Sequence, residues 1–374
     1  MKQFLLASLL YVFSAFAAHA ETGVSADAIL IGQSVVLSGP QAENGSQYTK
    51  GIKLYFDHVN AQGGVHGRKL ELATLDDAYV PSRAEENTRV LIEDKQVFAL
   101  FGYAGTGATL ASLPLAERTQ TPFIAPYTGA HALRAKVSPV LYHLRASYFD
   151  EMSKIVEYQS IVGMNKVAVI YQDDNFGREA YKSFEAAMEQ RKLKPVAVAA
   201  INASTFEARE PVQALIRAEP NAVVLATAGK ASSSVLREFA AQGKRPQFFG
   251  LSVVSASQLR SEAKEASTGI IISQVVPPLS GNKFAMVRQY RELLGDKVGE
   301  AHHASLEGYM AARVLVEALR RAGKDLTRTR LLAAFDGLRK YDLGDFFIDF
   351  SNGQHMGSNF VDLSIVRANG QFTQ

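Results

Sequence analysis

Residues 28–64, AILIGQSVVLSGPQAENGSQYTKGIKLYFDHVNAQGG, decide the fold. The stretch 28–36 is an apolar strand that stops at the turn signal Leu37-Ser38-Gly39-Pro40. Five apolar residues then recur at helical spacing and predict one buried helix face: Tyr48, Ile52, Tyr55, Phe56 and Val59. Gly63-Gly64 ends this helix. A strand followed by an amphipathic helix is the unit from which parallel sheets with crossover helices are built.

The same unit recurs along the chain. Further strands are expected at 69–75, 97–103 and 122–125, with helices from Pro81 and after Thr106 between them. A second series begins at Asp150 and alternates helices with strands at 166–171, 196–201, 222–227 and near Phe248 and Ile270. A helical block (283–294, 302–322 and 326–335) precedes two strands, at 346–348 and 361–366, which we expect to close as a hairpin. The pattern predicts an α/β fold of two doubly wound parallel-sheet units, with a ligand at the carboxyl ends of the strands.

The first twenty residues indicate export. Lys2 precedes an apolar run at 4–17, and Ala18-His19-Ala20 supplies the small-x-small pattern of a signal-peptidase site. The run is shorter than the roughly 20 residues that a membrane span needs. We therefore expect a signal peptide over 1–20, cleavage after Ala20 and a periplasmic mature chain that starts at Glu21.

Composition excludes several classes of protein. The net charge of +3 and the absence of long runs of like charge disfavour nucleic acid or an anionic membrane as partner. The chain has no Cys, which rules out disulfides, thiolate metal sites, a Cys nucleophile and a Cys-linked lipid anchor. Hydrophobic residues make up 47% and charged residues 21%, as in ordinary globular proteins.

The sequence contains no recognisable catalytic or metal-binding motif. The glycine-rich loop 102–109, GYAGTGAT, could expose helix amides to an anion, or Thr106 could simply cap its own helix. Leu110 stands where a dinucleotide fingerprint needs glycine. We interpret Asp76-Asp77 and Asp173-Asp174 as caps and loop contacts, and His302-His303 as ordinary surface or packing histidines. Without a nucleophile elbow, HExxH or Walker A sequence, we expect neither enzyme activity, nor a cofactor, nor a metal.

In the order of its motifs, the chain resembles the type I periplasmic substrate-binding proteins, specifically the leucine/isoleucine/valine-binding branch of ABC importers. The stretches that carry the resemblance are 31–40 (IGQSVVLSGP), 59–68 (VNAQGGVHGR), 76–78 (DDA), 101–102 (FG), 124–126 (IAP) and 173–177 (DDNFG). The resemblance implies two lobes joined by a three-strand hinge, with crossings near 145–147, 273–277 and 351–356. Lobe 1 would comprise 21–146 plus 276–351, and lobe 2 would comprise 147–275 plus 352–374.

The resemblance also implies a ligand site between the lobes, in which the first lobe holds a carboxylate. Thr106 falls on the family's hydroxyl position and Tyr127 on the second anchoring loop, where Thr128 or Gly129 takes the other hydroxyl position. The other candidate ligand-binding residues are Asn44, Tyr103, Tyr148, Phe176, Gly229 and Ser252. Tyr103 and Tyr148 are the expected walls of the cleft. Arg145 is equally well explained as part of a hinge salt bridge. The family's common disulfide positions are Tyr79 and Ala104 here, in agreement with the lack of Cys.

Ser252 is the departure that bears on the ligand. It stands where amino-acid binders carry the acidic partner of the ligand's ammonium group, and a neutral hydroxyl is a weaker partner. Small organic or aromatic carboxylates therefore become candidate ligands in addition to amino acids. We expect a monomeric periplasmic receptor that closes on a small carboxylate ligand and delivers it to an ABC permease. A periplasmic sensor for a membrane signalling partner is the alternative, and an exported hydrolase is a more remote one because it lacks a nucleophile elbow.

Overall fold

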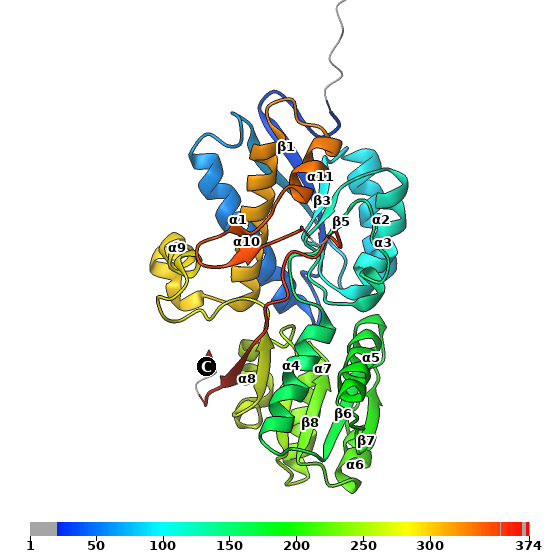
Figure 1. The fold of residues 1–374 in the computed structure, drawn as a ribbon. Coiled ribbons are helices and arrows are strands. Elements are labelled where there is room, and N and C mark those ends of the chain that lie inside the picture. Colours follow the sequence, from blue (N-terminus) through cyan, green and yellow to red (C-terminus); the bar gives the residue numbers. More distant parts are fainter. Residues whose placement is uncertain (1–20, 352, 369–371, 374) are drawn as a thin grey trace, which may run out of the picture.

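The computed structural model describes residues 21–351, 353–368 and 372–373, which form two lobes stacked one above the other (Figure 1). The predicted signal peptide over 1–20 lies outside the described residues. Each lobe has its own mainly parallel sheet with helices packed on it. The predicted fold class, two doubly wound lobes joined by a hinge, is confirmed. Among the helices of the described residues, none is long and apolar enough to cross a membrane.

The first lobe is built on a five-stranded parallel sheet of order β2-β1-β3-β4-β5. Its strands are β1 (Ala28–Val35), β2 (Lys69–Asp76), β3 (Ala99–Phe101), β4 (Phe123–Ile124) and β5 (Leu141–Tyr142). Its helices are α1 (Ala42–Ala61), α2 (Pro81–Arg89), which continues as a π-helical turn at Val90–Asp94, α3 (Thr106–Arg118), α9 (Ala285–Leu294), α10 (His303–Ala322) and α11 (Arg328–Asp336). The strand β1 lies between β2 and β3, so the order reverses beside it, where doubly wound folds bind ligands.

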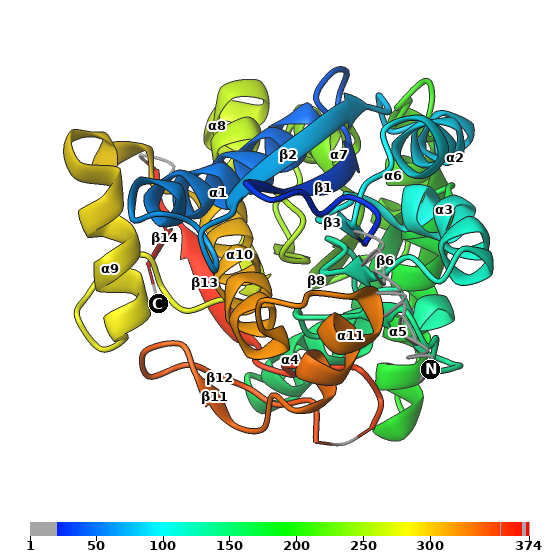
Figure 2. The same ribbon diagram turned by 90° about the horizontal axis from the view of Figure 1, so that it is seen from above.

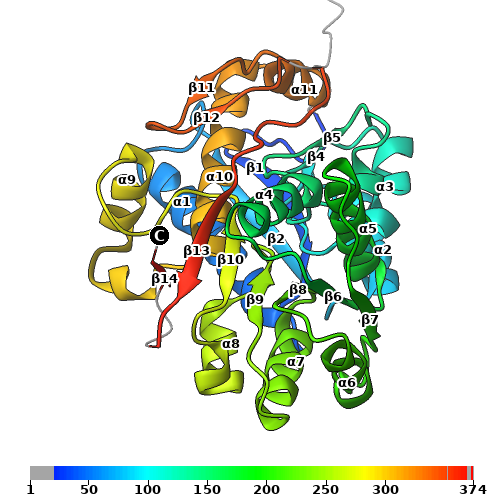
Figure 3. The ribbon, with the colours of Figure 1, turned by 60° about the horizontal axis from the view of Figure 1, so that its bottom comes forward.

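The second lobe contains a seven-stranded sheet of order β14-β13-β10-β9-β8-β6-β7. Figure 3 shows these strands side by side from β13 to β7. The strands are β6 (Val167–Gln172), β7 (Ala197–Ile201), β8 (Ala222–Ala226), β9 (Gln247–Gly250), β10 (Ile271–Gln274), β13 (Asp362–Val366) and β14 (Phe372–Thr373). The helices are α4 (Tyr148–Ile161), α5 (Asn175–Gln190), α6 (Arg209–Arg217), α7 (Gly229–Ala241) and α8 (Ala256–Ala263).

Close packing of α1 against α10 joins the C-terminal helical block to the first lobe (Figure 2). Gly51 and Gly308 permit the approach. A Cβ atom at Gly51 would lie 1.8 Å from the carbonyl oxygen of Ser305, and one at Gly308 would lie 2.1 Å from that of Tyr48. Because the backbones of α1 and α10 touch, this contact anchors the helical block 285–336 to the first lobe.

Three segments cross between the lobes. The chain leaves the first sheet after β5 and enters α4, returns after β10 to α9, and crosses again between β12 (Phe347–Ile348) and β13. A bridge between His143 and Met356 pairs the first and third crossings. The exact lobe boundaries, which the sequence places after residues 146, 275 and 351, stay a prediction.

One predicted strand pairing is wrong. The strands expected at 346–348 and 361–366 exist, but they do not form a hairpin with each other. β12 pairs with β11 (Tyr341–Asp342) in the first lobe, whereas β13 pairs with β10 and β14 in the second. The two segments belong to different lobes, and short strands take the partner that lies beside them in space. The short strand β5 and the helix α8 were not predicted.

Candidate functional site

A pocket of about 380 Å³, part of which is open to solvent, lies between the lobes at the carboxyl ends of the strands. Both lobes contribute to its lining: Val36, Gln41, Asn44, Gly45, Tyr79, Ala104, Gly105, Thr106, Tyr127, Tyr148, Phe176, Ala228 and Val253. The cleft is therefore where the doubly wound topology predicts it.

The first-lobe end of the pocket suits an anion. α3 begins at Thr106, and the preceding Gly105 has no side chain to cap the helix, so its first amides face the cleft without a side-chain acceptor. Helix N-termini favour negative charge. The hydroxyl of Thr106 does not cap α3 either, because it lies 2.7 Å from that of Thr128, which lies 3.3 Å from the hydroxyl of Tyr148. These three linked hydroxyls make one side of the pocket polar.

Aromatic rings make the walls. The rings of Tyr148 and Phe176 meet edge to face with their centroids 5.5 Å apart, and Tyr127 is backed by Tyr48 at 5.1 Å. Burial raises the pKa of Tyr148, Tyr127 and Tyr79, so these phenols keep their protons at neutral pH. The hydroxyl of Tyr127 donates to the carbonyl of Ser252 over 3.4 Å and Tyr79 hydrogen-bonds Asp174, so these two contribute mainly their rings, which can cover an apolar body.

Polar contacts across the cleft hold the lobes closed. The side-chain amide of Gln41 donates to the carbonyl of Ala228 over 3.2 Å, and that of Asn44 donates to the carbonyl of Val253 over 2.5 Å. Outside the pocket, the amide of Gln258 donates to the carbonyl of Pro40 over 3.0 Å. All three bonds join different lobes, so opening the cleft breaks them.

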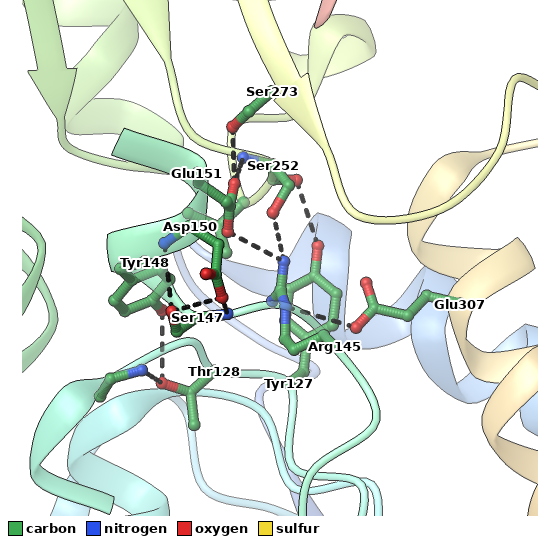
Figure 4. A network of polar contacts seen from close by, with 12 residues as sticks. Tyr127, Thr128, Arg145, Ser147, Tyr148, Asp150, Glu151, Ser252, Ser273 and Glu307 are labelled. Atoms are coloured by element: carbon green, nitrogen blue, oxygen red, sulfur yellow. Dashed lines mark hydrogen bonds and ion pairs between the residues drawn. The ribbon is translucent and has the colours of Figure 1, made fainter. Parts of the chain in front are cut away.

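Behind Tyr127 the hinge contains a buried charge cluster (Figure 4). Arg145 Nε lies 3.5 Å from Glu307 Oε1 of α10, and its Nη2 lies 3.8 Å from Glu151 Oε1 of α4. Glu151 Oε2 accepts hydrogen bonds from the amide of Ser252 and the hydroxyl of Ser273. Arg145 also donates to the Ser252 hydroxyl, and its guanidinium carbon lies 4.4 Å from the centre of the Tyr127 ring. The expected hinge salt bridge of Arg145 is thus present.

Burial raises the pKa of Glu307 to about 7, with Glu151 adding to the rise and Arg145 opposing it. One guanidinium faces two carboxylates in a site that water hardly reaches, so one carboxylate is held close to protonation. The cluster joins a residue from each lobe to the hinge segment between β5 and α4.

The predicted site residues divide into two groups. Asn44, Thr106, Tyr127, Tyr148 and Phe176 all line the pocket. Thr128 supports Thr106 from behind, and Gly129 packs so tightly on Tyr148 that a Cβ atom would lie 2.5 Å from its ring. Gly229 and Ser252 each directly follow or precede a lining residue, Ala228 and Val253 respectively.

Tyr103 is not a wall of the pocket, contrary to the expectation. Its side chain is fully buried in the first lobe, where the ring packs on Phe123 at 4.7 Å and the hydroxyl bonds that of Thr88 at 3.0 Å. Tyr103 lies after the end of β3, beyond Gly102 with its positive φ of 68°, and its side chain points away from the cleft into the core.

Eight lining residues were not predicted as site residues, and the two with the largest polar side chains among them are Gln41 and Tyr79. Tyr79 follows Asp76-Asp77 at the end of β2 and has a positive φ of 66°, which turns the chain toward the cleft. Its position just after a parallel strand was the available signal. Gln41 closes the turn between β1 and α1, and its sequence offers no comparable signal.

The paired aspartates are loop and cap residues, as predicted. Asp76 accepts from the amides of Leu37 and Ala78, and Asp174 caps α5 by accepting from the amide of Gly177. Neither pair is part of a metal-binding cluster: within the described residues, no group of three or more His, Asp or Glu side chains could hold a metal ion. His302 caps α10 by accepting from the amide of Ala304, and His303 is buried.

Known proteins resemble the chain over most of its length. The "Leu/Ile/Val-binding protein homolog 7" of Brucella suis is 26% identical over 313 residues, covering 79% of this chain and 77% of that protein. A crystal structure titled "a possible leucine/isoleucine/valine-binding protein" from Rhodopirellula baltica superimposes with a TM-score of 0.88 at 28% identity. It covers 94% of this chain and 98% of its own.

Two more distant structures share the fold and differ in their ligands. A branched-chain amino acid ABC transporter protein from Thermus thermophilus with bound valine has a TM-score of 0.82 at 18% identity, covering 93% of this chain and 95% of its own. A solute-binding protein of R. palustris in complex with benzoate has a TM-score of 0.81 at 19% identity, covering 92% and 95%.

The family model described as "Periplasmic binding protein" matches residues 28–371, nearly the whole chain. The chain therefore belongs to the periplasmic binding proteins, in the type I, leucine/isoleucine/valine-binding branch, whose members bind substrates and are not enzymes.

Proposed function

We propose that this protein is the solute receptor of an ABC importer, which captures a small carboxylate-bearing ligand, an amino acid or an organic acid, by closing its two lobes. The observation that carries the proposal is the pocket between the lobes, where the N-terminus of α3 and the hydroxyl of Thr106 meet aromatic walls. A carboxylate placed there receives hydrogen bonds from one lobe, and the second lobe covers its body.

Hinge closure is the mechanism. Phe176, Ala228 and Val253 come from the second lobe, so a ligand held by Thr106 gains their contacts only when the lobes meet. Such contacts shift an open–closed equilibrium toward the closed form. The bonds from Gln41 and Asn44 to opposite carbonyls add to the same shift. The closed form is the one that a permease would recognise.

The relatives support the carboxylate and leave its class open. Valine and benzoate, which the two distant structures contain, both carry a carboxylate, and valine has an ammonium group in addition. The carboxylate is the group that these two ligands share, and it is the group that we propose the N-terminus of α3 binds.

Thermal shift of ligand-stripped protein, followed by calorimetry with the best amino, aliphatic and aromatic acids, tests the proposal. A ligand that binds the native state raises its melting temperature. We expect Thr106→Val to weaken the best hit about 10- to 100-fold, because a hydrogen bond to a charged group contributes about 1.5–3 kcal/mol. Thr109→Val is the matched control: Thr109 is also in α3, donates to the carbonyl of Gly105 and does not line the pocket. Unchanged binding in Thr106→Val would show that the anchor lies elsewhere.

We also propose that the protein is exported, cleaved after Ala20 and monomeric. Export is what the family's periplasmic role requires, and the cleft is complete with both lobes from the same chain. Intact mass of the periplasmic protein checks the cleavage: the mature chain should begin at Glu21. Light scattering on a sizing column checks the monomer. Stimulation of the ATPase of a reconstituted candidate permease by the liganded receptor checks the partner.

A further inference from the structure

The pocket has no acidic side chain that could bind an ammonium group. None of its lining residues is Asp, Glu, Lys, Arg or His. The polar groups that face it are phenol and threonine hydroxyls, two side-chain amides and backbone atoms. An ammonium group enclosed there loses its hydration without gaining an anionic partner, which is unfavourable.

The carboxylates closest behind the pocket wall are already engaged. Asp174, beside Tyr79, caps α5 by accepting from the amide of Gly177. Glu151 accepts from the Ser252 amide over 2.8 Å and from the Ser273 hydroxyl over 2.6 Å, and it faces Arg145. Glu307 also faces Arg145, at 3.5 Å. Both side chains are buried, and neither lines the pocket. Both glutamates face Arg145 behind the pocket wall, and neither reaches the ligand space.

The charge packed directly on the pocket wall is positive. Tyr127 separates the guanidinium of Arg145 from the ligand space, with the guanidinium carbon 4.4 Å from the ring centre. Arg145 also occupies the hydroxyl of Ser252 as its hydrogen-bond acceptor. Ser252 is thus turned toward a cation of the protein, and its oxygen, already hydrogen-bonded to that cation, is a weak partner for a second cation on the ligand.

From this arrangement we infer that the ligand is a carboxylate without an ammonium group, such as a short aromatic or branched monocarboxylate. Arg145, acting through Ser252 and Tyr127, is the positioning residue that sets this preference. The inference rests on the proposed function and narrows it: one end of the ligand is an anion at the α3 N-terminus, and the rest is an uncharged body between aromatic rings.

Calorimetry with matched pairs tests the inference on the wild-type protein. The pairs differ only by the ammonium group: 3-phenylpropanoate against L-phenylalanine, 4-methylpentanoate against L-leucine, and 4-methylbenzoate against 4-(aminomethyl)benzoate. In every pair that binds, we expect the ammonium-free member to bind at least about 100-fold more tightly. An ammonium-bearing member that binds as tightly as its partner, or more tightly, overturns the inference and leaves the proposed function standing. Failure of every carboxylate to bind overturns the proposed function itself.

A variant tests the role of Arg145. In Arg145→Gln the two carboxylates lose their cation, so we expect the ratio of the two dissociation constants within a pair to fall at least tenfold. Arg134→Gln is the control, because Arg134 is a second hinge arginine that donates to the carbonyls of Thr128, Ala130 and Arg145 and contacts neither Tyr127 nor Ser252 through a hydrogen bond. The ratio cancels any general weakening of closure. An unchanged ratio in folded Arg145→Gln overturns the role of Arg145, and if this variant does not fold, the wild-type ratios alone decide the ligand class.

Discussion

Arg145 Nε lies 3.5 Å from Glu307 Oε1 in the buried hinge, although Glu307 belongs to α10 and Arg145 to the segment between β5 and α4 that leaves the first lobe. The same guanidinium faces Glu151 of the second lobe. One cation faces two carboxylates, and burial raises the pKa of Glu307 to about 7, so we expect the stability of the folded protein to depend on pH.

Glu307→Gln should therefore change how stability depends on pH. Burial raises the pKa of Glu307 from its usual 4.5 to about 7 in the folded protein. The folded state binds the proton more tightly than the unfolded state, so this stabilisation is complete below pH 4.5 and is lost as the pH rises through 7. Between pH 5 and 8, wild type should lose up to about 3 kcal/mol relative to Glu307→Gln. Urea unfolding of both proteins, followed by circular dichroism, measures the difference, and parallel curves for the two proteins would contradict it.

Gly229→Ala should prevent full closure. Gly229 begins α7 in the second lobe, and a Cβ atom there would lie 2.5 Å from the carbonyl oxygen of Pro40 in the first lobe. The lobes would have to separate to relieve this clash, so we expect ligand affinity to fall at least about tenfold and small-angle scattering with ligand to show a more open particle.

Gly243→Ala is the control for backbone strain. Gly243 is also in the second lobe and has a positive φ of 66°, close to the 52° of Gly229, but a Cβ atom there meets nothing within 4 Å. Both variants pay for a left-handed alanine, roughly 1 kcal/mol each, whereas only the clash at Gly229 acts across the cleft. Equal losses of affinity in the two variants would assign the effect to strain and not to closure.

Much of the fold could be predicted because local patterns report on local structure. The strand and helix after residue 28 are visible from apolar spacing and from Gly63-Gly64, and the crossover helices follow the same rule. The pairing of the C-terminal strands could not be predicted in this way, and the expected hairpin between them is wrong. A segment that crosses between the lobes separates β12 from β13. Each strand therefore pairs with a neighbour in its own lobe, β12 with β11 and β13 with β10.

Part of the candidate site could be predicted, because the loops that follow parallel strands gather at one edge of the sheet, where ligands bind. Thr106, Tyr127 and Phe176 each follow a strand of their lobe, and each lines the pocket. Tyr103 follows a strand too, but its ring points into the core, and sequence does not say on which side of β3 the following residue turns. The charge cluster was also hidden, because Glu151 and Glu307 are 156 residues apart (307 − 151) and meet only through Arg145.

Gly51→Ala should destabilise the first lobe without touching the pocket. The added Cβ atom would lie 1.8 Å from the carbonyl oxygen of Ser305, so α1 and α10 must move apart. Overpacking of this kind costs about 3 kcal/mol, and the better helix propensity of alanine returns about 1 kcal/mol. We expect a net loss of about 2 kcal/mol in urea unfolding. Gly299→Ala is the control, because a Cβ atom there meets nothing within 4 Å, and a similar loss in that variant would argue against the packing explanation.

Thr128→Val should weaken ligand binding through Thr106. The hydroxyl of Thr128 lies 2.7 Å from that of Thr106, 3.3 Å from that of Tyr148 and 3.3 Å from the amide of Ala130, and Thr128 does not line the pocket itself. Valine keeps the shape of the side chain but leaves the Thr106 hydroxyl without the partner that orients it. We expect the affinity for the best carboxylate to fall about 5- to 10-fold, which corresponds to the roughly 1 kcal/mol of one neutral hydrogen bond.

A double-mutant cycle separates this indirect role from direct contact. If Thr128 acts only by orienting Thr106, the double variant Thr106→Val, Thr128→Val should bind no more weakly than Thr106→Val alone, because the group to be oriented is already gone. Calorimetry on the wild type, the two single variants and the double variant gives the coupling. Additive losses would instead mean that Thr128 contacts the ligand itself, and the carboxylate would then lie deeper in the first lobe than the α3 N-terminus.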